Sequence, residues 1–294
     1  MKDVPFKGCG TALVTPFLPD GNIDYKTYAA LVRHQVAAGV DFLVPVATTA
    51  ETPALTQEEK AALMKITRAE APGLPLIAGV GVNCVRDTLT NIELLAPLGA
   101  DALLVVVPYY NKPTQEGQYL YFKTIAQSTD KPVIIYNVPG RTGTNMLPDT
   151  VLRLAGDCPN IVGIKEASGN YGQASEILRR APEGFSVLSG DDDLTLALMA
   201  TGAHGVISVA SNAAPQMVAA MVHKAAEGNF ADARELHHKL WPLFKACFVE
   251  SNPVPVKAAM EALGLCSAAV RLPLSAASDS TRALMKKILD DMAV

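Results

Sequence analysis

The sequence predicts an α/β fold, a (β/α)8 TIM barrel with a C-terminal helical appendage. From Gly10 onward one sequence pattern recurs: a short apolar run, a break of Gly, Asn, Thr or Pro, and a longer stretch with helical periodicity. It recurs about eight times, which is the number of strands that closes such a barrel. After the eighth unit only helical stretches follow. An open doubly wound sheet is the alternative, and the lack of a GxGxxG fingerprint disfavours it.

The predicted strands are short runs rich in β-branched and other apolar residues, as expected for parallel strands that are buried on both faces. They cover Gly10–Val14, Phe42–Val46, Pro75–Val80, Ala102–Val107, Val133–Tyr136, Ile161–Lys165, Ser186–Ser189 and Gly205–Val209.

The helices predicted between these strands mostly carry apolar residues at three-to-four spacing. One begins with a capping box in TQEE, from Thr56 to Glu59. The set comprises Tyr25–Ala38, Gln57–Ala71, Cys84–Pro97, Gln115–Ser128, Leu147–Ala155, Tyr171–Arg180, Leu194–Thr201 and Ala214–Ala226.

Three further helices, Phe230–Phe248, Pro253–Leu263 and Asp279–Met292, follow with no strand between them. We therefore expect a barrel over residues 1–228 and a helical region over residues 229–294 that packs on the barrel or on another subunit.

The amino-acid composition and the net charge indicate which kinds of binding partner to expect. Of 294 residues, 49% are hydrophobic and 18% are charged, which is typical of a well-packed globular chain. The net charge is −4 and the 25 Lys and Arg are scattered, so nucleic acid and membrane surfaces are not expected partners, whereas small molecules are. The N-terminus lacks the apolar core of a secretory signal, and no apolar run approaches the roughly 18 residues of a membrane span. We expect a cytoplasmic protein.

The cysteines and histidines give no sign of a metal or a cofactor. Five cysteines lie far apart without CxxC spacing, which predicts neither a disulfide framework nor a zinc site: Cys9, Cys84, Cys158, Cys247 and Cys266. The five histidines show no HExxH spacing. The run Asp191–Asp193 precedes a predicted helix, where carboxylates favour the N-terminal dipole, so we do not interpret it as a metal site.

The strongest candidate for a catalytic residue is Lys165. It lies in the run IVGIKEASG, at the C-terminal end of a predicted strand. An amine partly desolvated at such a place favours its neutral, nucleophilic form. The alternative is a surface lysine that only begins a loop. In a barrel, however, the C-terminal ends of the strands converge on one face, where ligands bind.

Other polar residues follow the neighbouring strands and should meet Lys165 on that face. Thr48 and Thr49 offer adjacent hydroxyls, although such residues often only cap backbone groups. Tyr136 is either a packed ring or a proton donor and acceptor. Arg141, in NVPGRTG, can clamp a carboxylate or form a salt bridge. The pair Tyr109–Tyr110 is unusual for an exposed loop unless it binds a ligand or meets a partner chain.

These motifs together resemble dihydrodipicolinate synthase, a family within the lysine-dependent pyruvate aldolases. The resemblance runs nearly end to end and rests on PYYNKPTQEG, YNVPGRTG, VGIKEASGN, SGDDD, GVISV and SNPVPVKAAMEALGL. It implies condensation of pyruvate with L-aspartate 4-semialdehyde to 4-hydroxy-tetrahydrodipicolinate in lysine biosynthesis, without a cofactor, by a dimer or a dimer of dimers. The Tyr and Lys motifs also occur in N-acetylneuraminate lyase and 2-keto-3-deoxy sugar acid aldolases, which usually lack the arginine. A non-catalytic barrel that binds a keto acid is a further alternative.

The resemblance also implies a role for each site residue. Lys165 matches the Schiff-base lysine and Tyr136 the acid/base residue. Thr49 and Tyr110 match the rest of its proton relay, with Tyr110 contributed across a dimer interface. Arg141 matches the residue that holds the second substrate by its carboxylate. The pyruvate pocket is implied to involve Thr48, Thr49, Gly190 and Ile207.

Two departures from the family pattern affect what we expect. The usual GTTGE is ATTAE here, with Ala47 and Ala50 in place of glycines, so a positive φ at either position is not expected. Asn83 and Tyr109 match the cleft where sensitive members bind L-lysine as an inhibitor, whereas Asp87 replaces a usual glutamate. Gln57 and Lys60 stand where those members often have histidines. A cationic Lys60 beside a cationic effector predicts weak or absent inhibition.

Overall fold

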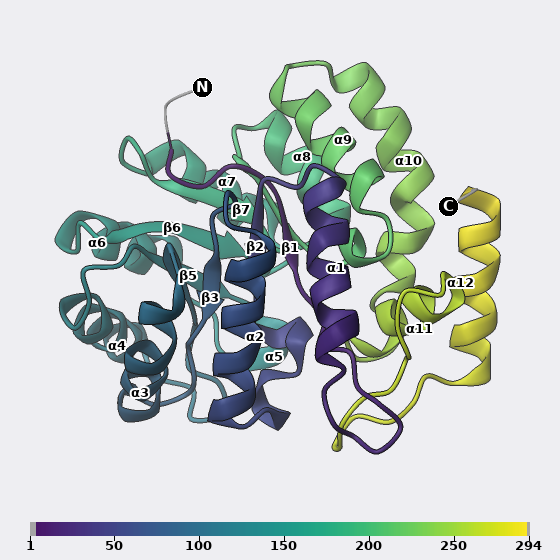
Figure 1. Ribbon diagram of the computed structural model, residues 1–294. Coiled ribbons are helices and arrows are strands. Elements are labelled where there is room, and N and C mark those ends of the chain that lie inside the picture. Colours follow the sequence, from purple (N-terminus) through teal and green to yellow (C-terminus); the bar gives the residue numbers. More distant parts are fainter. Residues whose placement is uncertain (1–3, 293–294) are drawn as a thin grey trace.

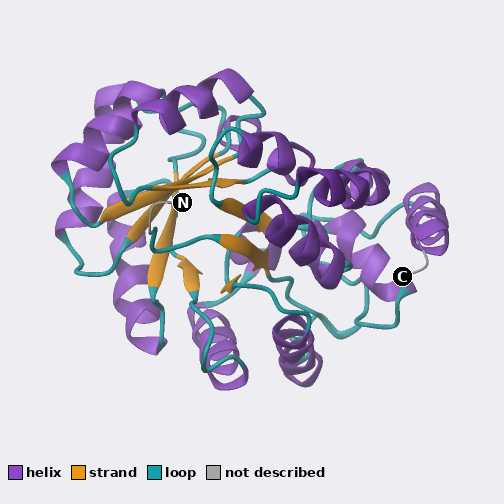
Figure 2. Ribbon diagram, turned by 90° about the horizontal axis from the view of Figure 1, so that it is seen from above, coloured by secondary structure: helices purple, strands orange, loops and turns teal. Residues whose placement is uncertain are grey.

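The computed structural model describes residues 4–292, in which eight parallel strands are surrounded by helices (Figures 1 and 2). The strands are β1 (Gly8–Ala12), β2 (Phe42–Val44), β3 (Ile77–Gly79), β4 (Ala102–Val106), β5 (Val133–Asn137), β6 (Ile161–Glu166), β7 (Ser186–Ser189) and β8 (Gly205–Ser208).

Strand pairing closes the sheet into a barrel. β1 pairs in parallel with both β2 and β8, and the order continues from β8 through β7, β6, β5 and β4 to β3. A parallel bridge between Leu43 and Leu76 joins β2 to β3. The barrel prediction is therefore confirmed and the open-sheet alternative is wrong, because the first and last strands of an open sheet do not meet.

The predicted strands are all present, with shifted ends. β2 stops at Val44 instead of Val46 because Val46 has a φ of +49°, outside the extended region. β3 is shorter than the predicted Pro75–Val80. A four-residue helix, α5 (Pro139–Thr142), lies inside NVPGRTG and was not predicted from the sequence.

The other helices also follow the predicted order. The barrel helices are α1 (Tyr25–Ala37), α2 (Gln57–Glu70), α3 (Val85–Leu95), α4 (Gln115–Gln127), α6 (Pro148–Asp157), α7 (Tyr171–Arg180), α8 (Thr195–Ala200) and α9 (Pro215–Ala226). The C-terminal helices α10 (Phe230–Ala246), α11 (Val254–Ala262) and α12 (Asp279–Met292) gather on one side of the barrel (Figure 1). Helix α10 packs on α9, and α12 packs on α10 and α11. Among residues 4–292 the helices are too short or too polar to cross a membrane.

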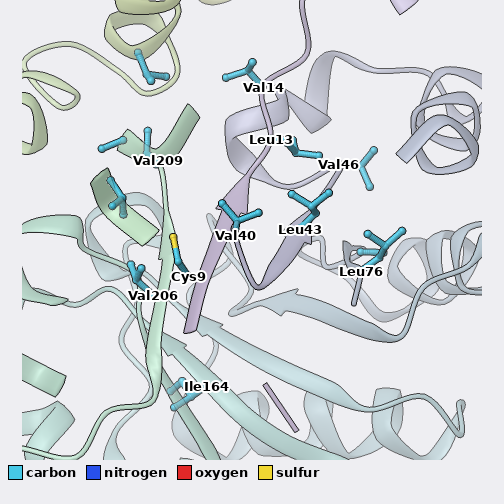
Figure 3. Close-up of a cluster of buried hydrophobic side chains, with 14 of the residues drawn as sticks. Cys9, Leu13, Val14, Val40, Leu43, Val46, Leu76, Ile164, Val206 and Val209 are labelled. Atoms are coloured by element: carbon cyan, nitrogen blue, oxygen red, sulfur yellow. The ribbon is translucent and has the colours of Figure 1, made fainter. Parts of the chain in front are cut away.

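Two apolar layers hold these elements together. One fills the space between the strands and the surrounding helices, and Figure 3 shows part of it around Cys9, Leu43 and Val206. The other fills the barrel interior. Side chains alternate along β5, so Val133 and Ile135 belong to the outer layer while Ile134 and Tyr136 belong to the interior one. This alternation places the Tyr136 ring inside the barrel.

Candidate active site

Lys165 and Tyr136 are neighbours inside the barrel, on adjacent strands. Tyr136 of β5 lies in register with Lys165 of β6. The Lys165 Nζ lies 4.2 Å from the centroid of the Tyr136 ring. The two residues are only 4% and 7% exposed. An amine and a phenol thus meet near the C-terminal ends of two strands, where the sequence predicted them.

Burial shifts the pKa values of both groups in opposite directions. It lowers the pKa of Lys165 to about 8, because the ammonium loses its hydration; Asp191 and Asp192 oppose this shift and Arg141 adds to it. Burial raises the pKa of Tyr136 to about 12, while the charge of Arg141 and the Thr48 hydroxyl act to lower it. Near neutral pH roughly one Lys165 amine in ten is therefore neutral, while the phenol keeps its proton.

Gly190 lies close against the Lys165 side chain. A Cβ atom there would lie 2.5 Å from the Cβ of Ala167 and 3.1 Å from the Cε of Lys165. Only glycine leaves room for the lysine side chain at this approach. The next residue, Asp191, has its pKa raised to about 6, chiefly by burial. Ile207 is fully buried and belongs to the same interior layer as Tyr136.

The loop after β2, residues 45–55, is hereafter called the threonine loop. Two of its hydroxyls have different neighbours: Thr48 lines the same cavity as Tyr136 and lowers the pKa of that phenol, whereas Thr49 accepts a hydrogen bond of 3.0 Å from Nδ2 of Asn252. Thr48 thus lines the cavity together with Tyr136, while Thr49 is not among its lining residues. Neither alanine of ATTAE has a positive φ, as expected, but Val46 and Glu51 do, with φ of +49° and +58°.

A cavity of about 260 Å³ opens at the C-terminal ends of β2 to β5. Tyr136, Thr48 and Arg141 line it, and the Tyr136 ring also contacts Lys165, which is not itself among the lining residues. Arg141 is exposed and forms no ion pair with any residue between 4 and 292. Its guanidinium is therefore available to a carboxylate that enters the cavity.

Comparisons with known proteins match this geometry. The sequence profile of the Dihydrodipicolinate synthetase family matches residues 5–292. This chain belongs to that family. A 4-hydroxy-tetrahydrodipicolinate synthase of Phocaeicola vulgatus is 46% identical over 289 residues, which cover 98% of this chain and 97% of that protein.

Solved structures of the dihydrodipicolinate synthetase family also superpose along the whole chain. The dihydrodipicolinate synthase of Thermotoga maritima matches with a TM-score of 0.96 and 44% identity, over 98% of this chain and 99% of that one. A synthase of Cyanidioschyzon merolae, solved with lysine bound, matches with a TM-score of 0.95 and 38% identity, over 99% of both chains. The family resemblance drawn from the motifs is confirmed.

The loop after β4, residues 107–114, is hereafter called the tyrosine loop. Tyr110 has a φ of +74° and is 88% exposed, so the single chain does not bring it to Lys165. Tyr109 lines the cavity, and burial raises the pKa of its phenol, an effect that the Asn83 backbone opposes. Asp87 is exposed and pairs with Arg86, its Oδ1 lying 2.7 Å from Arg86 Nε.

Two residues that contact the threonine loop were not predicted from the sequence. Asn252 contacts Thr49, and Lys257 forms a fully buried ion pair of 2.8 Å with Glu51. Both lie in the stretch SNPVPVK, within one of the motifs that carry the family resemblance. A lysine within an otherwise apolar helical turn was the available signal, since burying a charge requires a partner.

Proposed function

We propose that this chain is a lyase that condenses pyruvate with L-aspartate 4-semialdehyde to give 4-hydroxy-tetrahydrodipicolinate, a step of the diaminopimelate route to L-lysine. The name of the Phocaeicola vulgatus relative supports this reaction. The observation that carries the proposal is the buried Lys165 amine, with its pKa lowered to about 8, beside the protonated phenol of Tyr136.

The proposed chemistry begins when Lys165 Nζ attacks the ketone carbon of pyruvate. The adduct loses water to form an imine, and loss of a proton from the methyl carbon then gives an enamine. That carbon forms the new bond to the aldehyde carbon of the second substrate, which takes up a proton as its hydroxyl forms. The amino group of this substrate then displaces Lys165 Nζ from the imine carbon, which closes the ring and frees the lysine. Tyr136 moves the protons, with Thr48 as its partner in place of the Thr49 that the resemblance implied. Arg141 holds the carboxylate of the aldehyde substrate at the cavity mouth.

Trapping with borohydride tests the proposal. Incubation with pyruvate and borohydride should add one reduced pyruvate to the peptide that contains Lys165, detected by mass spectrometry. The Lys165→Ala variant should gain none, whereas Lys239→Ala, a control at an exposed position of α10, should react like the wild type. Folded wild-type protein that forms no adduct would contradict the mechanism and favour a barrel that only binds keto acids. Turnover with aspartate semialdehyde, compared with sugar-derived aldehydes, then decides between this enzyme and the related aldolases.

We also propose a homo-oligomer, a dimer or a dimer of dimers, in the cytoplasm. The exposure of Tyr110 supports the assembly, because a phenol in the relay must be buried when it works. All five cysteines are free thiols, as is typical of a reducing compartment.

Finally, we propose that Asn83, Asp87 and Tyr109 form a weak L-lysine site. The Cyanidioschyzon merolae relative, solved with lysine bound, supports such a site. Here the cavity beside Tyr109 is also lined by Lys60, which is only 8% exposed and has no side-chain partner between residues 4 and 292. Burial lowers the pKa of Lys60. An unpaired cation opposes the binding of a cationic effector, so inhibition by L-lysine should be weak or absent.

A further inference from the structure

The C-terminal region, residues 229–292, reaches the active site through the threonine loop. Asn252, between α10 and α11, donates from Nδ2 to the hydroxyl oxygen of Thr49 at 3.0 Å. Lys257, on α11, donates from Nζ to a Glu51 carboxylate oxygen at 2.8 Å. The backbone N–H of Arg271 donates to the other oxygen of Glu51 at 2.9 Å. Three hydrogen bonds from one region thus converge on two residues of one loop, Thr49 and Glu51.

The Asn252 contact controls how the Thr49 hydroxyl can be used. A hydroxyl carries one proton, and an amide nitrogen can only donate to it. Thr49 therefore accepts from Asn252 and must direct its own proton elsewhere. The adjacent Thr48 lines the cavity together with Tyr136, so the contact that fixes Thr49 also fixes the backbone that carries Thr48.

The Asn252 amide is difficult to explain by stability alone. Asn252 is 6% exposed, and its Oδ1 has no hydrogen-bond partner between residues 4 and 292. A buried polar atom without a partner lowers stability, so an apolar side chain would be the more stable choice if packing were the only requirement.

The ion pair between Lys257 and Glu51 holds the part of the threonine loop that follows Thr49. Lys257 is fully buried, and its Nζ also donates to the Thr15 carbonyl at 2.8 Å. Thr15 in turn donates from Oγ1 to the Ala50 carbonyl at 2.8 Å. Glu51 has left-handed backbone angles, φ 58° and ψ 37°, which a non-glycine residue keeps only when its surroundings fix it.

We propose that Asn252 is a positioning residue for the proton relay, and that the Lys257–Glu51 pair holds the loop on which it acts. The C-terminal region then helps to position the catalytic residues of the active site. Asn252 touches no reacting atom; it acts through Thr49, which keeps Thr48 in place for Tyr136. This inference rests on the proposed roles of Lys165 and Tyr136 and goes beyond them.

Exchange of the pyruvate methyl protons for deuterium, followed by NMR, tests the proposal because exchange requires the enamine but not the second substrate. Asn252→Ala should slow exchange about tenfold, as expected when a hydrogen bond of about 1.4 kcal/mol no longer supports proton transfer. The KM for pyruvate should change less than about twofold, since Thr49 does not line the cavity. Thr49→Val removes the same hydrogen bond from the other side and should slow exchange equally. Combining the two substitutions should cause little further loss.

Met285→Ala serves as the matched control, because Met285 is a fully buried residue of the C-terminal region that lies on α12. It should lower the melting temperature and leave exchange at the wild-type rate. If Asn252→Ala and Thr49→Val also lower only the melting temperature, their role is structural and the proposal is wrong. Wild-type protein that neither exchanges nor forms an adduct would instead contradict the proposed function itself.

Discussion

The threonine loop and the tyrosine loop line the same cavity, but they differ in how far groups of their own chain hold them in place. Both contain non-glycine residues with positive φ: Val46 and Glu51 in the first, Tyr110 and Lys112 in the second. Each such residue costs about 1–2 kcal/mol and persists where its surroundings hold it. The threonine loop is held by buried groups of its own chain, including the fully buried Lys257. The tyrosine loop exposes 88% of Tyr110.

This difference indicates where the missing support comes from. The tyrosine loop is tied to its own chain by a 3.3 Å hydrogen bond from the Tyr110 N–H to the Thr142 carbonyl, and by a 2.9 Å one from Asn111 to the Asn83 carbonyl. These bonds fix its backbone but leave the Tyr110 ring uncovered. One loop is thus completed by the C-terminal region of its own chain, and the other, in the proposed assembly, by a second chain.

Breaking the buried pair should have the largest effect. Lys257→Met leaves the Glu51 carboxylate buried without its cation, which should lower the free energy of unfolding by about 3–5 kcal/mol. Urea denaturation of the wild type and the variant measures this loss. Adding Glu51→Gln to Lys257→Met removes the unpaired carboxylate charge and should restore most of the lost free energy of unfolding. A Lys257→Met loss below about 1 kcal/mol would show that the pair does not hold the loop.

Substitutions in the tyrosine loop should affect activity and spare stability. Tyr110→Ala should change the free energy of unfolding of the dilute chain by less than about 0.5 kcal/mol, because the ring contacts little of its own chain. It should lower kcat about 100-fold if Tyr110 serves the relay of a partner.

Mixing two inactive variants decides which chain supplies Tyr110. A dimer of one Tyr110→Ala chain and one Lys165→Ala chain contains one site with both residues, provided that Tyr110 crosses the interface. Random exchange of subunits should then recover about a quarter of the wild-type activity. Mixtures that stay inactive, although mass spectrometry shows hybrid dimers, would place Tyr110 outside the partner's site.

The two loops also show what the sequence could reveal. Strands and helices with strong local patterns were predicted in order, and strand ends in a barrel converge, so Lys165, Tyr136 and Arg141 could be grouped. The partners of the threonine loop could not be found in this way. Asn252 lies 203 residues from Thr49, and Lys257 lies 206 residues from Glu51. No periodicity encodes a pairing across such a distance. Adjacent threonines look equivalent in the sequence, whereas the structure places them in a 3-10 turn, Thr48–Ala50, in which successive side chains point in different directions.

The pH dependence of pyruvate trapping should sharpen the comparison further. Only neutral Lys165 attacks, and its pKa is about 8, so the initial rate of adduct formation should rise about tenfold per pH unit below pH 8 and level off above it. Asn252→Ala should loosen the threonine loop and admit water, which favours the ammonium and moves this midpoint upward. Tyr110→Phe should leave the midpoint near 8. Equal midpoints in all three proteins would mean that the threonine loop does not exclude water from the Lys165 amine.

The smallest expected effect concerns the cavity that both loops line, where Thr48 and Tyr109 face the same space as Lys60. Added L-lysine should leave wild-type turnover nearly unchanged, and a micromolar inhibition constant would contradict this. Lys60→Ala removes a buried positive charge and should strengthen inhibition roughly fivefold, the change expected from a like-charge repulsion of about 1 kcal/mol. Lys239→Ala on the exposed face of α10 should not alter it. Equal inhibition of Lys60→Ala and wild type would show that Lys60 does not face the effector, and that the weakness of the site arises from the tyrosine loop instead.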